Sequence, residues 1–246
     1  MELKETGIEC FMAVPDLISL LNLSFGFLAI LMAINNQIAT SAIFIIVALI
    51  FDSVDGWVAR KLSRVDKYGF GKNIDSLADV VSFGVAPGIL LYCAGNNYLG
   101  LGTEIGNFIS LDYLLAIVAL FVVICGVLRL TRFNVIADKV DFNGFIGSPI
   151  PATGVVMATF VLSGLFNPYW AMILMIIMSI LMISNLKYSK LNNPIYLLIF
   201  MILIFLIIIP YPIVFAGVNI PATIVLILTL SYIFIELFRG SFIANS

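Results

Sequence analysis

The sequence contains no histidine. This absence excludes Ser-His-Asp triads, histidine-ligated metal sites and imidazole proton relays. Charge is also scarce, because only 11% of the residues are Asp, Glu, Lys or Arg, whereas soluble domains carry about 25%. Hydrophobic residues make up 62% of the chain. Together these values predict a polytopic membrane protein rather than a soluble domain.

The sequence also gives no sign of cysteine-based sites, of a basic patch or of a secretory signal. The three cysteines, Cys10, Cys93 and Cys125, lack metal-site or disulfide spacing, so we interpret them as small packing residues. The net charge is −2 and no basic patch is present, so we expect no nucleic-acid partner. The polar and acidic start, MELKETGIEC, is not typical of a cleavable secretory signal. Residues 1–13 are instead a candidate interfacial segment.

Long apolar segments fill most of the chain. A helix needs about 20 mainly apolar residues to cross a bilayer. The candidate spans are residues 14–34, 39–60, 73–95, 111–133, 150–166, 168–185, 195–215 and 218–238. We therefore predict a single all-α polytopic domain over residues 1–246. Within it we expect catalytic helices in 14–166 and additional C-terminal membrane helices in 167–246.

The basic residues test this count. If the chain crosses the membrane about eight times from a cytoplasmic amino terminus, all 12 Lys and Arg residues fall on the cytoplasmic side. Six or seven crossings would scatter them over both faces. We predict about eight transmembrane helices with both termini cytoplasmic. The prolines of IPYPIV (209–214) should kink or end the 195–215 helix.

Four aspartates stand where apolar helices are expected. They lie in FDSVDGWVAR (51–60) and NIDSLADVVSFG (73–84). One acid near a helix end is readily explained as a cap or a snorkelling surface charge, but four unpaired charges in a membrane cost on the order of 10 kcal/mol. Arg60 can offset only one of them. Either a cation binds to these carboxylates or they line a wet cavity.

Helical geometry favours a bound cation. One face of the first helix, within about a 100° arc, carries Asp52, Asp55, Gly56 and Ala59. Asp75 and Asp79 lie one turn apart on the next helix, which returns antiparallel and brings both pairs to the cytoplasmic side. Carboxylates with no His or Cys nearby suit Mg²⁺ or Mn²⁺. Two such ions beside an arginine suit a diphosphate substrate and an in-line displacement.

These two segments resemble the signature of the CDP-alcohol phosphotransferase family, D-x-x-D-G-x-x-A-R, a spacer, then G-x-x-x-D-x-x-x-D. All the fixed positions are present, as Asp52, Asp55, Gly56, Ala59, Arg60, Gly71, Asp75 and Asp79. The spacer between the two halves is longer than usual for the family, which we interpret as a longer cytoplasmic loop, KLSRVDKYGF (61–70).

The resemblance implies a two-metal centre of Mg²⁺ or Mn²⁺ that binds the diphosphate of a CDP-lipid. Asp52 and Asp75 would bridge both metals, while Asp55 completes one site and Asp79 the other. Asp79 would also be the catalytic base that takes the proton from the acceptor hydroxyl. The resemblance further implies a homodimer, and the predicted topology places the active site on the cytoplasmic side.

Nucleotide contacts are also implied by the resemblance. They are Gly56, Ala59, Arg60 and Gly71, to which VPDLISLLN (14–22) adds Ser19 and Asn22. That stretch resembles the family's P-N-x-x-T segment, with Asp16 and Ser19 in place of Asn and Thr. The alternative for Ser19 and Asn22 is a purely structural role in capping or interhelical hydrogen bonding.

The acceptor is indicated by further segments. SLADVVSFGVAPG (76–88), LRLTRFN (128–134) and GFIGSPIPATG (144–154) resemble the phosphatidylserine synthase branch of the family. This implies transfer of the phosphatidyl group of CDP-diacylglycerol, or of an archaeal CDP-lipid, to L-serine, with release of CMP. The expected acceptor contacts are Arg129, Arg132, Asn134 and Ser148.

The residues alone leave alternatives open. Arg129 and Arg132 lie three residues apart, and a pair of arginines suits either a carboxylate or a phosphate. Glycerol 3-phosphate or an inositol phosphate could therefore replace serine. Arg132 could also be an ordinary cytoplasmic charge. An ion-coupled transporter would carry acids through several spans, whereas here they cluster in two.

Overall fold

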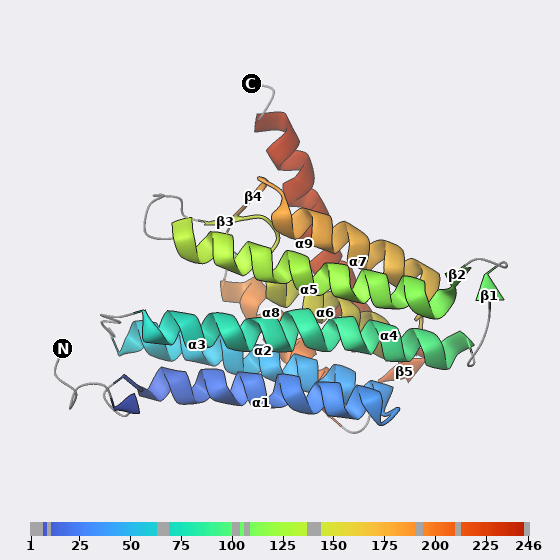
Figure 1. Cartoon of the computed structure of the whole chain (residues 1–246), viewed down its shortest axis with the longest axis horizontal. Helices are drawn as coiled ribbons and strands as arrows, with labels where there is room; N and C mark the ends of the chain where they lie inside the picture. The colour runs from blue at the N-terminus through green and yellow to red at the C-terminus, as the bar shows by residue number, and fades with distance from the viewer. Residues whose placement is uncertain are drawn as a thin grey trace.

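The computed structural model describes residues 7–8, 11–62, 69–99, 104–105, 109–136, 144–189, 194–209 and 213–243. Over these residues the chain forms a helical bundle (Figure 1). The helices are α1 (Val14–Ile34), α2 (Ile38–Lys61), α3 (Phe70–Asp79), the π-helical η3 (Val80–Val85), α4 (Ala86–Leu99), α5 (Leu111–Ile136), α6 (Ile150–Leu162), α7 (Pro168–Ile183), α8 (Pro194–Ile208) and α9 (Ile220–Ile243).

Short antiparallel strand pairs accompany the helices. β1 (Glu104–Ile105) pairs with β2 (Ile109–Ser110), and β5 (Val214–Phe215) pairs with β6 (Val218–Asn219). β3 (Gly144–Ile146) pairs with β4 (Lys187–Ser189), which follows two helices later in the chain. The predicted interfacial segment 1–13 lies mostly outside the described residues. The sequence pattern predicted helices only and did not indicate these strand pairs.

The helices confirm a helical membrane protein. In the described part of the chain, α1, α2, α5 and the continuous rod of α3, η3 and α4 are long and apolar enough to cross a bilayer. A helix occupies most of each predicted span, and α8 ends at Ile208, shortly before Pro210, as the prolines predicted. Because the described apolar parts of α6, α7, α8 and α9 are shorter, the count of eight crossings and the orientation of the termini stay predictions.

Helix α1 shows how the bundle packs. Its inward face consists of the small and polar residues Ser19, Asn22, Gly26, Ala29 and Ala33. Its outward face carries the exposed apolar residues Leu17, Leu21, Phe27, Leu28 and Leu31. Lipid tails are as apolar as these leucines, so helices associate in a membrane mainly through close packing of small residues and through hydrogen bonds. The pattern of α1 therefore suits a helix with one face toward lipid.

A close backbone approach joins α1 to η3. A methyl group added at Gly26 would lie 2.7 Å from Ser82 Cα, so only glycine permits this contact.

The π-helical turn begins directly after Asp79, and Pro87, which lacks an N–H, follows in the first turn of α4. Pro87 cannot donate the backbone hydrogen bond of a regular α-helix, and the π-helical turn changes the hydrogen-bonding register at the same point.

One end of the bundle gathers the polar residues. The start of α1 contacts the second half of α2 through Ser19 and Asp55, and the start of α3 contacts the end of α5, where Lys72 Nζ donates to the Asn134 carbonyl oxygen at 2.9 Å. Strand β3 lies near the end of α5 in Figure 1. The four aspartates are therefore carried by two adjacent helices at the end of the bundle that also holds β3.

Candidate metal centre and substrate pocket

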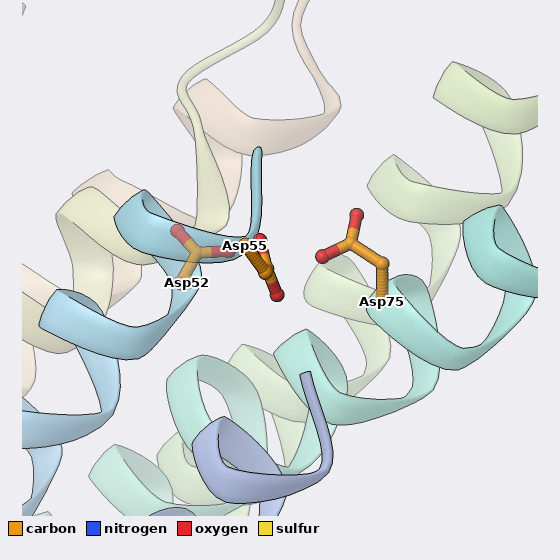
Figure 2. Close-up of side chains that lie close together, drawn as sticks. All are labelled: Asp52, Asp55 and Asp75. Carbon is orange, nitrogen blue, oxygen red and sulfur yellow. The ribbon is translucent and has the colours of Figure 1, made fainter. Parts of the chain in front are cut away.

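Three of the predicted aspartates converge. Asp52, Asp55 and Asp75 each offer one carboxylate oxygen, and these atoms all lie within 4.8 Å of one another. Figure 2 shows Asp75 pointing from α3 toward the two side chains of α2. Asp55 is buried, whereas Asp52 and Asp75 are partly exposed. Carboxylates held this close repel one another, and a bound cation removes that repulsion, so the arrangement fits a divalent ion with oxygen ligands.

Asp79 adjoins this group rather than completing it. Its carboxyl group lies within hydrogen-bonding reach of Asp52, and its Oδ1 accepts a hydrogen bond from Asn22 Nδ2 at 3.2 Å. It is buried, with 7% of its surface exposed. The sequence predicted that all four carboxylates converge at one site. The structure brings three oxygens together and places the fourth carboxylate one helical turn deeper, beside Asp52.

Helix α1 holds two of the aspartates. Ser19 Oγ donates to Asp55 Oδ2 at 2.6 Å, and Asn22 holds Asp79 as described above. Asn22 is itself fixed, because its backbone carbonyl accepts a hydrogen bond from Ser82 Oγ at 2.9 Å. In this structure both residues therefore orient carboxylates. Their predicted contact with the nucleotide stays a prediction.

A cavity of about 260 Å³ opens beside the aspartates. Its lining residues are Pro15, Asp16, Ser19, Asp55, Gly56, Ala59, Gly71, Lys72 and Asp75. The cavity thus includes Ser19 and three of the other predicted nucleotide contacts, and the small residues among them leave room for a ligand. Arg60 lies on the exposed side of α2, outside this lining. Lys72 also lines the cavity, but the sequence did not predict it as a nucleotide contact, although it directly follows the signature residue Gly71.

Arg129 is the buried cation nearest to the aspartates. Only 5% of its surface is exposed, and its guanidinium carbon lies 5.4 Å from the centre of the Phe133 ring and 5.9 Å from that of Phe145. It lies within electrostatic range of Asp52, Asp75 and Asp79. Its Nε is buried and has no hydrogen-bond partner among the described residues. A buried donor without a partner is costly, so this side chain is suited to an anionic ligand.

The other predicted acceptor residues differ in their surroundings. Arg132 directs both terminal nitrogens to the end of α7 and to β3, where it donates to four backbone carbonyls. Asn134 donates from Nδ2 to Ser76 Oγ at 2.8 Å, while its Oδ1 is buried without a partner in the described residues. Ser148 Oγ is likewise buried and unpartnered there. Asn134 and Ser148 can therefore still form hydrogen bonds with a ligand, whereas the terminal nitrogens of Arg132 already donate to backbone carbonyls.

A polytopic helical protein with converging carboxylates, an adjacent cavity and a buried arginine has the features of a membrane enzyme that acts on a phosphorylated substrate. The CDP-alcohol phosphatidyltransferase family model matches residues 12–186, which include all of these features. The chain belongs to this family. Helices α8 and α9 lie beyond the matched region.

Individual relatives make the comparison more specific. The chain is 41% identical to archaetidylserine synthase of Methanothermobacter thermautotrophicus, over 78% of this chain and 76% of the relative. It is 39% identical to a CDP-diacylglycerol–serine O-phosphatidyltransferase of Methanocaldococcus jannaschii, over 84% of this chain and 88% of the relative. An enzyme of the same name from Bacillus subtilis is 35% identical over 71% of this chain and 89% of the relative.

Proposed function

We propose that this protein transfers the phosphatidyl group of a CDP-linked lipid to the hydroxyl of L-serine and releases CMP. The lipid is CDP-diacylglycerol or its archaeal counterpart, since relatives named for both kinds of product are more than a third identical to this chain over the matched residues. The observation that carries the proposal is the convergence of Asp52, Asp55 and Asp75 beside a cavity and a buried arginine.

The donor set fits Mg²⁺ or Mn²⁺. All the candidate ligands are carboxylate oxygens, and neither histidine nor a cysteine takes part in the cluster. We propose a two-metal centre held by Asp52, Asp55, Asp75 and Asp79. When bound, such ions neutralise a diphosphate and stabilise the charge on the leaving phosphate. Supporting this, Ser19 fixes Asp55 and Asn22 fixes Asp79, as expected for outer hydrogen bonds that orient metal ligands.

The cavity would hold the nucleotide end of the lipid. Gly56, Ala59 and Gly71 line it without bulky side chains, so a ligand can approach the backbone closely. We propose that these residues contact the CDP moiety. Arg60 would reach it from the exposed side of α2, and Ser19 and Asn22 from α1. The apolar outer faces of the helices would leave the lipid tails in the bilayer.

Asp79 is the proposed base. In the transfer, the serine hydroxyl oxygen forms a bond to the lipid-side phosphorus, the bond from that phosphorus to the CMP oxygen breaks, and the hydroxyl proton passes to a carboxylate. General bases typically contribute about 10²–10⁴-fold to such steps. Asp79 suits this role because it lies outside the three converging oxygens, so one of its carboxylate oxygens can bind a metal while the other stays free to take the proton.

The acceptor carboxylate would bind to Arg129. A guanidinium matches a carboxylate in two parallel hydrogen bonds, and that of Arg129 is buried with an unpartnered Nε. Its position near Asp52, Asp75 and Asp79 would place the serine hydroxyl beside the phosphate to be attacked. Asn134 and Ser148 would supply further contacts. We also propose eight crossings, both termini and the active site on the cytoplasmic side, and a homodimer.

The direct test is an acceptor panel. Purified protein would receive CDP-diacylglycerol and Mg²⁺ with serine, glycerol 3-phosphate, inositol 3-phosphate or inositol, and CMP release would be measured. We expect serine to be the only one of these four acceptors that supports CMP release. Arg129→Lys should raise the KM for serine, because lysine cannot form the two parallel hydrogen bonds. Lys61→Gln, which removes an exposed charge from the end of α2, is the control. Release with a phosphorylated acceptor instead of serine would refute the proposed substrate.

A further inference from the structure

Arg132 joins three segments of backbone. Its Nη2 donates to the carbonyl oxygens of Met182 and Ser184, and to that of Ile146 in β3, at 2.9–3.0 Å. Its Nη1 donates to the carbonyl oxygen of Ile183 at 2.9 Å. The last carbonyls of a helix have no partners within the helix, and a cation there also offsets the negative end of the helix dipole. One side chain of α5 thus caps α7 and holds β3.

The segment after β3 packs closely against Arg132 and the end of α7. Gly147 has φ of +79°, and its N–H donates to the Leu186 carbonyl oxygen at 2.8 Å. A methyl group added at Gly147 would overlap the Met182 carbonyl oxygen and would lie 2.6 Å from Arg132 Nη2. Next along the chain, the Ser148 N–H donates to the Leu181 carbonyl oxygen at 3.0 Å. The turn at Gly147 therefore has no room for any side chain.

Strand β3 carries one wall of the Arg129 site. Phe145 lies in β3, opposite Tyr188 of β4, and its ring lies 5.9 Å from the Arg129 guanidinium. Phe133, on the same helix as Arg129, supplies the other ring. Strand β4 packs against α9, where the ring centres of Tyr188 and Tyr232 are 6.2 Å apart. The position of the β3–β4 strand pair relative to α5 thus determines where the Phe145 ring lies against Arg129.

We propose that Arg132 is a positioning residue: by capping α7 and holding β3 of the β3–β4 strand pair, it sets Phe145 against Arg129 and so orients Arg129 toward the acceptor carboxylate. The inference rests on the proposed role of Arg129 in binding serine. It gives Arg132 an indirect part in recognition where direct contact was predicted. It also gives α9, which lies outside the matched family region, a part in supporting the acceptor site.

Gly147→Ala tests this without changing any charge. The methyl group breaks the cap while both arginines remain, so we expect the KM for serine to rise about tenfold and the KM for the CDP-lipid to change less than about twofold. Gly217→Ala is the matched control, because Gly217 has a similar φ of +82° but a methyl group there would meet nothing within 4 Å. Its kinetic constants should stay at wild-type values.

Two further variants guard against misfolding. Arg132→Lys keeps the charge but loses the forked hydrogen bonds, and Phe145→Leu removes the ring while keeping an apolar side chain. Both should reproduce the selective rise in the KM for serine. Combined with Arg129→Lys, Gly147→Ala should add little, since the group that it positions is already altered.

The outcomes separate the inference from the proposed function. If Arg129→Lys raises the KM for serine but the folded variants Gly147→Ala, Arg132→Lys and Phe145→Leu do not, the positioning role of Arg132 is wrong. The proposed binding of serine by Arg129 then still stands. Multiplicative effects of Gly147→Ala and Arg129→Lys would also refute it, because they would mean independent contributions. If Arg129→Lys leaves the KM for serine unchanged, both the acceptor site and the inference fail.

Discussion

Ser19 and Asp55, 36 residues apart in the sequence, are joined by a buried hydrogen bond of 2.6 Å from the serine hydroxyl to the carboxylate. Asp55 is one of three carboxylates that converge at the candidate metal centre. The first helix thus orients a ligand carried by the second. This link connects a loosely matching stretch of α1 to the strongest motif in the chain.

Ser19→Ala should therefore weaken metal activation. Loss of a hydrogen bond that orients a metal ligand typically lowers metal affinity or activity by about 10-fold to 100-fold, and we expect the lower end because Asp55 keeps its place on α2. The measurement is the Mg²⁺ concentration for half-maximal CMP release. Ser24→Ala is the control, because Ser24 is exposed and bonds only to the carbonyl oxygen of Leu20. Equal values for the two variants would contradict this role of Ser19.

Asp79 and Asp55 should separate chemistry from binding. Asp79→Asn should reduce turnover by at least about 10²-fold while CDP-lipid binding survives in part, because it removes the base and leaves three clustered carboxylates. Asp55→Asn should weaken CDP-lipid binding at least as strongly as it slows turnover. Both quantities would be measured side by side on purified variants. Loss of CDP-lipid binding in Asp79→Asn but not in Asp55→Asn would reverse the proposed roles.

Close packing of α1 against η3 should make Gly26 intolerant of a side chain. Gly26→Ala would press a methyl group against the Ser82 backbone, and overpacking of this kind typically costs about 1–3 kcal/mol. We expect a lower thermal unfolding temperature in detergent and, because Asn22 follows any shift of α1, weaker turnover. Gly56→Ala is a useful comparison for stability, since its methyl group would meet only Arg60 Nη1, at 3.4 Å. Equal unfolding temperatures would show that the contact is not limiting.

Topology offers a prediction independent of catalysis. A reporter fused after Arg239 should be cytoplasmic, and a tag between residues 95 and 107 should be external, because the basic residues then all lie on the cytoplasmic side. Accessibility of the tag and activity of the reporter in intact cells measure this. Finding both on the same side would rule out eight crossings.

The sequence predicted the elements that depend on local pattern. Apolar length predicted the positions of the helices, and the four-residue spacing of Asp75 and Asp79 predicted that both lie on one face of one helix. Asp79 nevertheless stands apart from the three clustered oxygens. Its depth depends on how α2 and α3 pack, and helical periodicity within one element cannot supply that information.

Other features depend on contacts between distant segments. The five hydrogen bonds of Arg132 join α5 to residues that lie about 50 positions later in the chain, and to β3. Nothing in LRLTRFN distinguishes an arginine that binds a ligand from one that caps a helix. The available signal was Gly147, since a glycine between two short apolar segments often marks a backbone position with positive φ.

The central claim is that the aspartate cluster is a metal centre for phosphatidyl transfer to serine. The most direct measurement is serine-dependent CMP release by purified protein, after removal of metal with EDTA and during titration with Mg²⁺ or Mn²⁺, for the wild type and for Asp75→Asn. We predict that EDTA abolishes release, that either ion restores it in the wild type, and that folded Asp75→Asn stays inactive at every concentration. Metal-independent release, or near-native activity of Asp75→Asn at saturating Mg²⁺, would contradict the account.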